Sequence, residues 1–125
     1  QAEDACQMLF NALEPTTYVR PHCHLAAEKS EMMLVVQGAF GVLLFSAEGL
    51  LQNTHILRAG SADFAIHIAA GQFHSMVSLE AGSVFFETKA GPYQPLTDVE
   101  MAAWAPAEHS AAAADYLAWM QQQFS

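Results

Sequence analysis

Two histidines separated by a single residue mark the part of the sequence that could do chemistry. They end the segment Tyr18-Val-Arg-Pro-His-Cys-His24, whose proline and β-forming residues predict extended backbone. Because alternate side chains of a strand share a face, His22 and His24 point the same way, and Arg20 joins them. Cys23 faces the opposite side, as expected of a structural thiol rather than a nucleophile. Two neighbouring imidazoles of this kind can begin a metal site.

A carboxylate and a third histidine complete the ligand set. Glu31 opens the next apolar stretch, and His74 opens a later one just after Gly71. Three neutral imidazoles and one carboxylate from neighbouring strands can converge and bind a borderline divalent ion. We therefore predict one divalent metal ion held by His22, His24, Glu31 and His74. These ligand types are compatible with iron, manganese, nickel, cobalt or zinc, so the sequence leaves the metal open.

The elements that must position these side chains follow the spacing of the glycines. Gly38, Gly49, Gly60, Gly71 and Gly82 fall eleven residues apart. Turns at this interval predict short strands, as in a sandwich or a small barrel. The apolar stretches between the turns are 32–36, 40–45, 50–57, 64–68, 73–79 and 84–88. The length predicts one domain over 1–125, with a barrel core over about 16–92.

Short helices are expected at both ends of the barrel. The segment 3–13 can form an amphipathic N-terminal helix with Met8, Leu9 and Ala12 on one side. The Ala-rich segment 110–124 is typical of a C-terminal helix. Its buried stripe would consist of Tyr116, Leu117, Met120 and Phe124.

Part of the ligand set resembles the first motif of the cupin superfamily. That motif reads His-x-His, then Glu, then six residues and a glycine, and it matches His22, His24, Glu31 and Gly38. The stretch between His24 and Glu31 is longer than in the generic motif, which leaves Glu28 as a rival carboxylate. We prefer Glu31, because it alone keeps the six-residue distance to Gly38.

The second cupin motif and a narrower resemblance extend across most of the chain. The motif usually reads Pro-x-Gly-x-x-His and matches 69–74, although Ala69 replaces the proline. Four stretches are similar to WbuC-type cupin-fold metalloproteins, namely 18–24, 41–45, 85–93 and 104–108. The resemblance implies an all-β, cupin-type double-stranded β-helix, or jelly-roll barrel, that binds a metal. For some bacterial members it also implies a link to surface-polysaccharide gene clusters, without a settled reaction.

Further residues are candidates for contacting a small-molecule substrate. Arg20 could direct its guanidinium at an anionic group, or form an internal ion pair with Glu87. Glu87 shares one strand face with Lys89, where both could lie beside the metal or be exposed to solvent. Tyr93 is expected at a pocket wall by resemblance, as is Trp104, although either aromatic ring could instead cover a core edge.

The charge balance excludes two classes of partner. The chain has four basic and 13 acidic residues, giving a formal net charge of -9. Nucleic acid and anionic membrane surfaces need clustered Lys and Arg, and the sequence has no such cluster. No apolar run is long enough to span a bilayer, and two cysteines without a disulfide pattern suit a cytoplasmic location. The sequence leaves open whether residues precede Gln1.

These features predict a metal-dependent enzyme that acts on a small polar metabolite, either carbohydrate-like or anionic, by isomerase, epimerase or oxygenase chemistry. A six-coordinate ion with the four ligands keeps about two open positions, where a substrate could bind. The alternatives are a non-enzymatic binding or sensing module and a purely structural metal site. The sequence assigns no catalytic residue. A homodimer is expected, because a short jelly roll exposes sheet edges that need covering.

Overall fold

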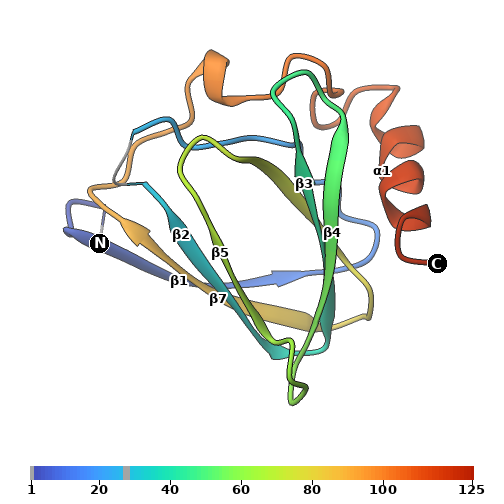
Figure 1. The fold of residues 1–125 in the computed structure, drawn as a ribbon, viewed down its shortest axis with the longest axis horizontal. Helices are drawn as coiled ribbons and strands as arrows, with labels where there is room; N and C mark the ends of the chain where they lie inside the picture. Colours follow the sequence, from blue (N-terminus) through green and yellow to red (C-terminus); the bar gives the residue numbers. More distant parts are fainter. Residues whose placement is uncertain (1, 27–28) are drawn as a thin grey trace.

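Seven β-strands in two facing sheets make up most of the regular secondary structure in a computed structural model that describes residues 2–26 and 29–125 (Figure 1). The strands are β1 (Cys6–Leu13), β2 (Glu31–Gln37), β3 (Ala39–Phe45), β4 (Leu51–Arg58), β5 (Ala65–Ile68), β6 (Phe73–Ser78) and β7 (Ser83–Ala90). A 3-10 helix, Asp98–Glu100, and the helix α1 (Ala113–Gln122) follow them. Glu28, the rival carboxylate, lies outside the described residues.

The strands confirm the all-β jelly-roll prediction. One sheet has the order β1-β7-β2-β5 and the other the order β4-β3-β6, and every pair is antiparallel. The six strands expected from the glycine spacing are all present, with ends displaced by at most two residues. Each glycine of the series adopts a positive φ, from 75° at Gly38 to 95° at Gly49. Turns with this left-handed backbone favour glycine because it has no Cβ to clash.

Side-chain alternation divides the apolar interior into two clusters. The inner cluster fills the space between the sheets with Met33, Val35, Phe40, Val42, Leu57, Met76 and Phe85. The outer cluster joins the three-stranded sheet to α1 through Leu43, Phe45, Val77, Leu117 and Met120. Because the strand β3 supplies residues to both clusters, both of its faces are buried. Met33 and Val35 of β2 and Met76 of β6 belong to the inner cluster, so this face of both strands points into the barrel.

The helix α1 confirms the C-terminal helix expected over 110–124, and it covers the outside of the three-stranded sheet (Figure 1). Leu117 and Met120 are buried in the outer cluster, and Phe124 packs against it. The close approach depends on Gly41, since a Cβ at that position would lie 2.5 Å from the ring of Phe124. Within the part of the chain that is described, no helix is long and apolar enough to cross a membrane.

The expected N-terminal helix over 3–13 is wrong, because this segment forms the edge strand β1. Its register with β7 runs from Cys6 opposite Ala90 to Leu13 opposite Ser83. A helix of this length is marginal in water on its own, whereas the edge of β7 offers a row of backbone hydrogen-bonding groups. The rings of Phe10 and Phe86 also pair across the two strands, with centroids 5.0 Å apart. Pairing with β7 therefore overrides the helical pattern.

Candidate metal centre

Residues 18–24 carry two of the expected ligands and cross between the sheets as extended backbone. They do not join either sheet as a strand, but His22 forms isolated antiparallel bridges with His74 and Met101. Reciprocal backbone hydrogen bonds tie His22 to His74, with N to O distances of 3.1 and 2.9 Å. Cys23 is fully buried, and burial raises the pKa of its thiol. A buried thiol of this kind fits the expected structural role.

The structure brings the four expected ligand residues together. The ring centroid of His22 lies 4.5 Å from that of His74 and 5.8 Å from that of His24. At the start of β2, Glu31 places Oε1 2.7 Å from Nε2 of His74 and Oε2 3.7 Å from Nε2 of His24. Since β2 and β6 belong to different sheets, the cluster links the two sheets across the barrel.

Backbone carbonyls orient two of the imidazoles. Nδ1 of His22 donates to the carbonyl of Arg20, and Nδ1 of His74 donates to the carbonyl of Gln72, both at 2.9 Å. Because a carbonyl only accepts, Nδ1 holds the proton, and Nε2 of each neutral ring keeps its lone pair. Contacts of this kind orient histidine ligands in metal sites.

Two ring nitrogens of the cluster are buried without a hydrogen-bond partner. Among the described residues these are Nε2 of His24 and Nε2 of His74. Oε1 of Glu31 lies 2.7 Å from Nε2 of His74, but a neutral ring that carries its proton on Nδ1 has none on Nε2 to donate to the carboxylate. Buried polar atoms without partners are rare in folded proteins and call for an explanation such as a bound ion.

Electrostatics hold His22, His24 and Glu31 in the protonation states that bind metals. Burial, followed by the proximity of His74, lowers the pKa of His22 to about 4. Burial also lowers the pKa of His24. Burial alone would raise the pKa of Glu31, but contacts with His74, and the charges of His24 and Lys89, lower it to about 2. At neutral pH His22 and His24 are therefore neutral imidazoles and Glu31 is an ionised carboxylate, as metal binding requires.

The donor set fits a divalent ion after small side-chain movements. In residues 2–26 and 29–125, no group of three or more His, Cys, Asp or Glu already has the geometry of a metal site. Ligand atoms about 2.1 Å from a shared ion stand roughly 3 Å apart. The contacts of Glu31 with His74 and His24, at 2.7 and 3.7 Å, lie on either side of that spacing. A shared ion would require the side chains to move until both contacts approach this spacing.

An inner cavity of about 190 Å³ adjoins the ligand cluster. It is lined by Asn11, Leu13, Val19, His22, Glu31, Met76, Phe85, Glu87 and Lys89. Nδ2 of Asn11 donates to Oε1 of Glu87 at 3.0 Å, and burial raises the pKa of Glu87. Glu87 is therefore a partly buried carboxylate beside the candidate ligands, although its contact with a substrate stays a prediction.

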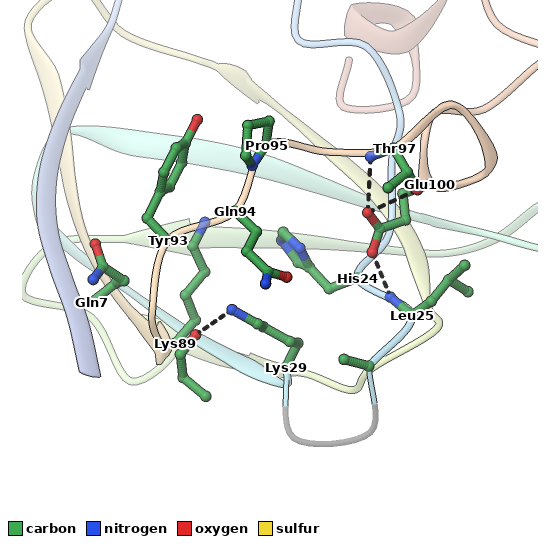
Figure 2. Close-up of a pocket in the computed structure, with 12 residues that line it drawn as sticks. Gln7, His24, Leu25, Lys29, Lys89, Tyr93, Gln94, Pro95, Thr97 and Glu100 are labelled. Carbon is green, nitrogen blue, oxygen red and sulfur yellow. Dashed lines mark hydrogen bonds between the residues drawn. The ribbon is translucent and has the colours of Figure 1, made fainter. Parts of the chain in front are cut away.

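An outer pocket of about 250 Å³ includes His24 and the loop that follows β7 (Figure 2). Figure 2 shows Lys89, Tyr93 and Gln94 around this pocket together with His24. Tyr93 is 56% exposed and stands at the pocket wall, where the sequence resemblance places it. Its role in substrate binding stays a prediction.

Arg20 is not among the residues that line either the inner cavity or the outer pocket. Its Nε and one terminal nitrogen donate to the carbonyl of Ala102, at 3.2 and 2.8 Å. The alternative ion pair between Arg20 and Glu87 does not form in the described part of the chain. Glu87 instead accepts a hydrogen bond from Asn11. The strand parity that placed Arg20 on the ligand face fixes only the direction of its Cβ, and the long side chain turns to the backbone carbonyl of Ala102.

Sequence reasoning overlooked Asn11, which lines the inner cavity, and expected Trp104 at a pocket wall that it does not line. Asn11 was hidden by the expected helix, although Gln7 and Asn11 alternate with Met8 and Phe10 as in a strand. Trp104 lies outside both pockets, because its Nε1 donates to the carbonyl of Ala47 at 2.9 Å and its ring packs on the outer cluster.

Sequence comparisons give little about this chain. A family model described as a domain of unknown function, DUF6016, matches residues 1–57, which is less than half of the chain. No curated protein matches the sequence.

Solved structures give the fold. A variant of oxalate decarboxylase from Bacillus subtilis aligns with a TM-score of 0.60 and 17% identity, over 79% of this chain and 24% of that chain. Oxalate decarboxylase from Lactobacillus farciminis, solved as a formate complex, has a TM-score of 0.57 and 23% identity, over 75% and 26%. KdgF from Halomonas sp. has a TM-score of 0.57 and 22% identity, over 74% and 75%.

This chain spans about a quarter of the length of the two oxalate decarboxylases. At identities this low, the structural similarity establishes the fold and leaves the activity open. The two facing sheets and these structural relatives together show that the chain has the cupin jelly-roll fold.

Proposed function

We propose that this chain is a metal-dependent enzyme whose single divalent ion is held by His22, His24, Glu31 and His74. The observation that carries the proposal is the pair of buried, unpartnered Nε2 atoms beside an ionised carboxylate. Leaving such atoms without a partner costs about 1–3 kcal/mol each, which a bound ion would offset. The Mn(II) centres of Bacillus subtilis oxalate decarboxylase give a precedent for a metal in a protein of similar fold.

The proposed reaction takes place in the inner cavity on a small polar metabolite. When bound, a divalent ion polarises a carbonyl or lowers the pKa of a water molecule. Glu87 lines the same cavity as His22 and Glu31, and its raised pKa suits a group that takes and returns a proton. Asn11 holds the carboxyl group of Glu87 in place. An isomerase, epimerase or oxygenase reaction is compatible with this arrangement.

Glu87 favours an enzyme over a sensing module, because a binding module needs no proton-transfer group. A purely structural metal is disfavoured by the cavity, since structural sites are normally closed by four protein ligands without adjoining space. We further propose that the chain is a WbuC-type cupin and that residues 1–125 form one domain. The similar stretches within 18–108 and the packing of α1 on the barrel support these two points.

The direct test is metal analysis of protein purified without added metal, followed by titration of metal-free protein with Mn(II), Fe(II), Co(II), Ni(II) and Zn(II). The same preparations are then screened for turnover of sugar phosphates, nucleotide sugars and small hydroxy acids. One equivalent of metal and turnover by the metal-loaded protein alone are expected. Absence of stoichiometric binding for every metal would end the proposal.

We also propose that the chain forms a homodimer through the outer face of its four-stranded sheet. The residues that alternate with the inward-facing ones are Met8, Phe10, Ala12, Met32, Leu34, Ala65, His67, Val84, Phe86 and Thr88. Phe10 is 71% and Met8 65% exposed on this face, which carries no charged side chain among those residues. In a chain of net charge -9, an uncharged face lets two copies meet without strong repulsion at the contact.

A further inference from the structure

We propose that Lys89 binds the carboxylate of a small organic ligand whose other end coordinates the metal. The inference rests on the proposed function and names the substrate class of the same site. Lys89 is the register partner of Glu31, so the cation and a proposed metal ligand lie opposite each other on β7 and β2. Its side chain shares the inward face of β7 with Phe85 and Glu87.

Lys89 stands where the two cavities come together. It lines the inner cavity with His22 and Glu31, and it lines the outer pocket with His24. Among the described residues it is the only one that lines both. A ligand that enters from the outer pocket and reaches the metal would therefore pass the ammonium group (Figure 2).

Lys89 is also available, whereas the other three cations have partners. Arg20 donates to the carbonyl of Ala102, and Arg58 is paired with Glu80. Nζ of Lys29 donates to the carbonyls of Ala90 and Pro92, both at 2.9 Å. Within residues 2–26 and 29–125, Nζ of Lys89 makes no hydrogen bond or ion pair.

The carboxylates around Lys89 are already occupied by other groups. Glu31 contacts the imidazoles of His24 and His74, and Glu87 accepts a hydrogen bond from Asn11. Glu31 and Glu87 act on Lys89 through their charge but accept no hydrogen bond from it, so a ligand carboxylate would supply the missing acceptor.

The outer pocket is suited to an anion. The carboxylate of Glu100, which lines it, is occupied by the backbone N–H groups of Leu25 and Thr97 at 2.9 and 3.0 Å. Tyr93 and Gln94 line the same pocket and bring a hydroxyl and an amide that can donate to a ligand oxygen. The volumes of about 250 and 190 Å³ restrict the ligand to a small molecule.

The experiment uses the Co(II)-loaded protein, because the visible absorption of Co(II) reports both metal binding and coordination by an added ligand. Oxalate is the anionic probe, imidazole is the neutral probe, and inorganic phosphate is the competing anion. Lys89→Met is compared with Lys89→Arg, which keeps the positive charge. The control is Arg58→Met, which also removes one positive charge, but from the exposed ion pair of Arg58 with Glu80.

The expected result is that Lys89→Met weakens oxalate binding by about tenfold or more, as for loss of a charge-assisted hydrogen bond. Co(II) stoichiometry and imidazole affinity should stay within about twofold of the parent protein. Lys89→Arg should recover part of the oxalate affinity, and Arg58→Met should bind oxalate like the parent.

Five outcomes would overturn the inference. Unchanged oxalate affinity in Lys89→Met would show that Lys89 does not contact the ligand. Loss of Co(II) from the same variant would show that Lys89 stabilises the cluster of metal ligands instead of binding the organic ligand. Tighter binding of phosphate than of oxalate, or no oxalate binding by the parent at roughly 10 mM, would exclude a carboxylate as the ligand. Failure of the parent to bind Co(II) would overturn the proposed function as well, so the two failures are distinguishable.

Discussion

Oε1 of Glu31, at the first residue of β2, lies 2.7 Å from Nε2 of His74 in β6. The two strands belong to different sheets, so this contact joins the sheets at one end of the barrel interior. Glu31 is 5% and His74 1% exposed, and a contact so well shielded from water is sensitive to loss of either partner.

Replacing any one of the three histidines should remove the metal. We expect His22→Ala, His24→Ala and His74→Ala each to weaken metal binding by more than about 100-fold, since loss of an outer-shell partner alone costs roughly 10–100-fold. Metal content after dialysis measures the effect. His67→Ala is the matched control, because His67 is exposed on β5. Near-full occupancy in all three variants would refute the ligand assignment.

Glu31→Gln should lower metal affinity more than Glu28→Gln does. The amide keeps the size of the side chain but removes the negative charge that favours a divalent ion. Parallel titrations of the two variants with Co(II) provide the measurement. A stronger effect of Glu28→Gln would mean that the rival carboxylate is the ligand.

The metal-free protein should lose stability as the pH falls from 6.5 towards 4. His22 has a pKa of about 4 in the folded state against an ordinary value of 6.5, so the unfolded state binds more protons between these values. Its contribution is complete above pH 6.5, and at pH 5 about 2 kcal/mol of it should be gone. Urea unfolding at pH 7.5 and pH 5 measures the loss. His22→Gln should show a smaller difference between the two pH values, and an equal difference would contradict the assignment.

Arg20→Met should destabilise the protein and leave its metal content unchanged. The guanidinium donates two hydrogen bonds to the carbonyl of Ala102, and together these contribute about 1–3 kcal/mol. Thermal unfolding and metal analysis of the same sample separate the two properties. A variant as stable as the parent would show that the contact with Ala102 contributes nothing.

Phe10→Glu should convert the proposed homodimer to a monomer. A carboxylate on each copy would meet its counterpart, or be desolvated, on an otherwise uncharged face. Light scattering over a range of concentrations measures the mass. Leu50→Glu is a control of similar chemistry, because Leu50 is 70% exposed and precedes β4 rather than belonging to the four-stranded sheet. A monomeric parent protein would exclude the dimer.

The sequence by itself determined the strands β2 to β7 and the identity of the candidate ligands. Glycines at Gly38, Gly49, Gly60, Gly71 and Gly82 place turns where a positive φ is tolerated, and the stretches between them are apolar enough to form strands. The alternation of side chains then puts His22 and His24 on one side. Both signals are local, so they can be interpreted without knowledge of the tertiary structure.

Only the tertiary structure decided the state of the N-terminal segment and the direction of the long cations. The segment 3–13 has a helical pattern, but the edge of β7 supplies backbone partners that no local pattern reveals. Arg20 shares the parity of His22, yet it turns to the carbonyl of Ala102, while Lys89 points to the ligand cluster. Parity fixes the direction of Cβ alone, and the remaining bonds of a long side chain follow whichever partner the folded chain brings within reach.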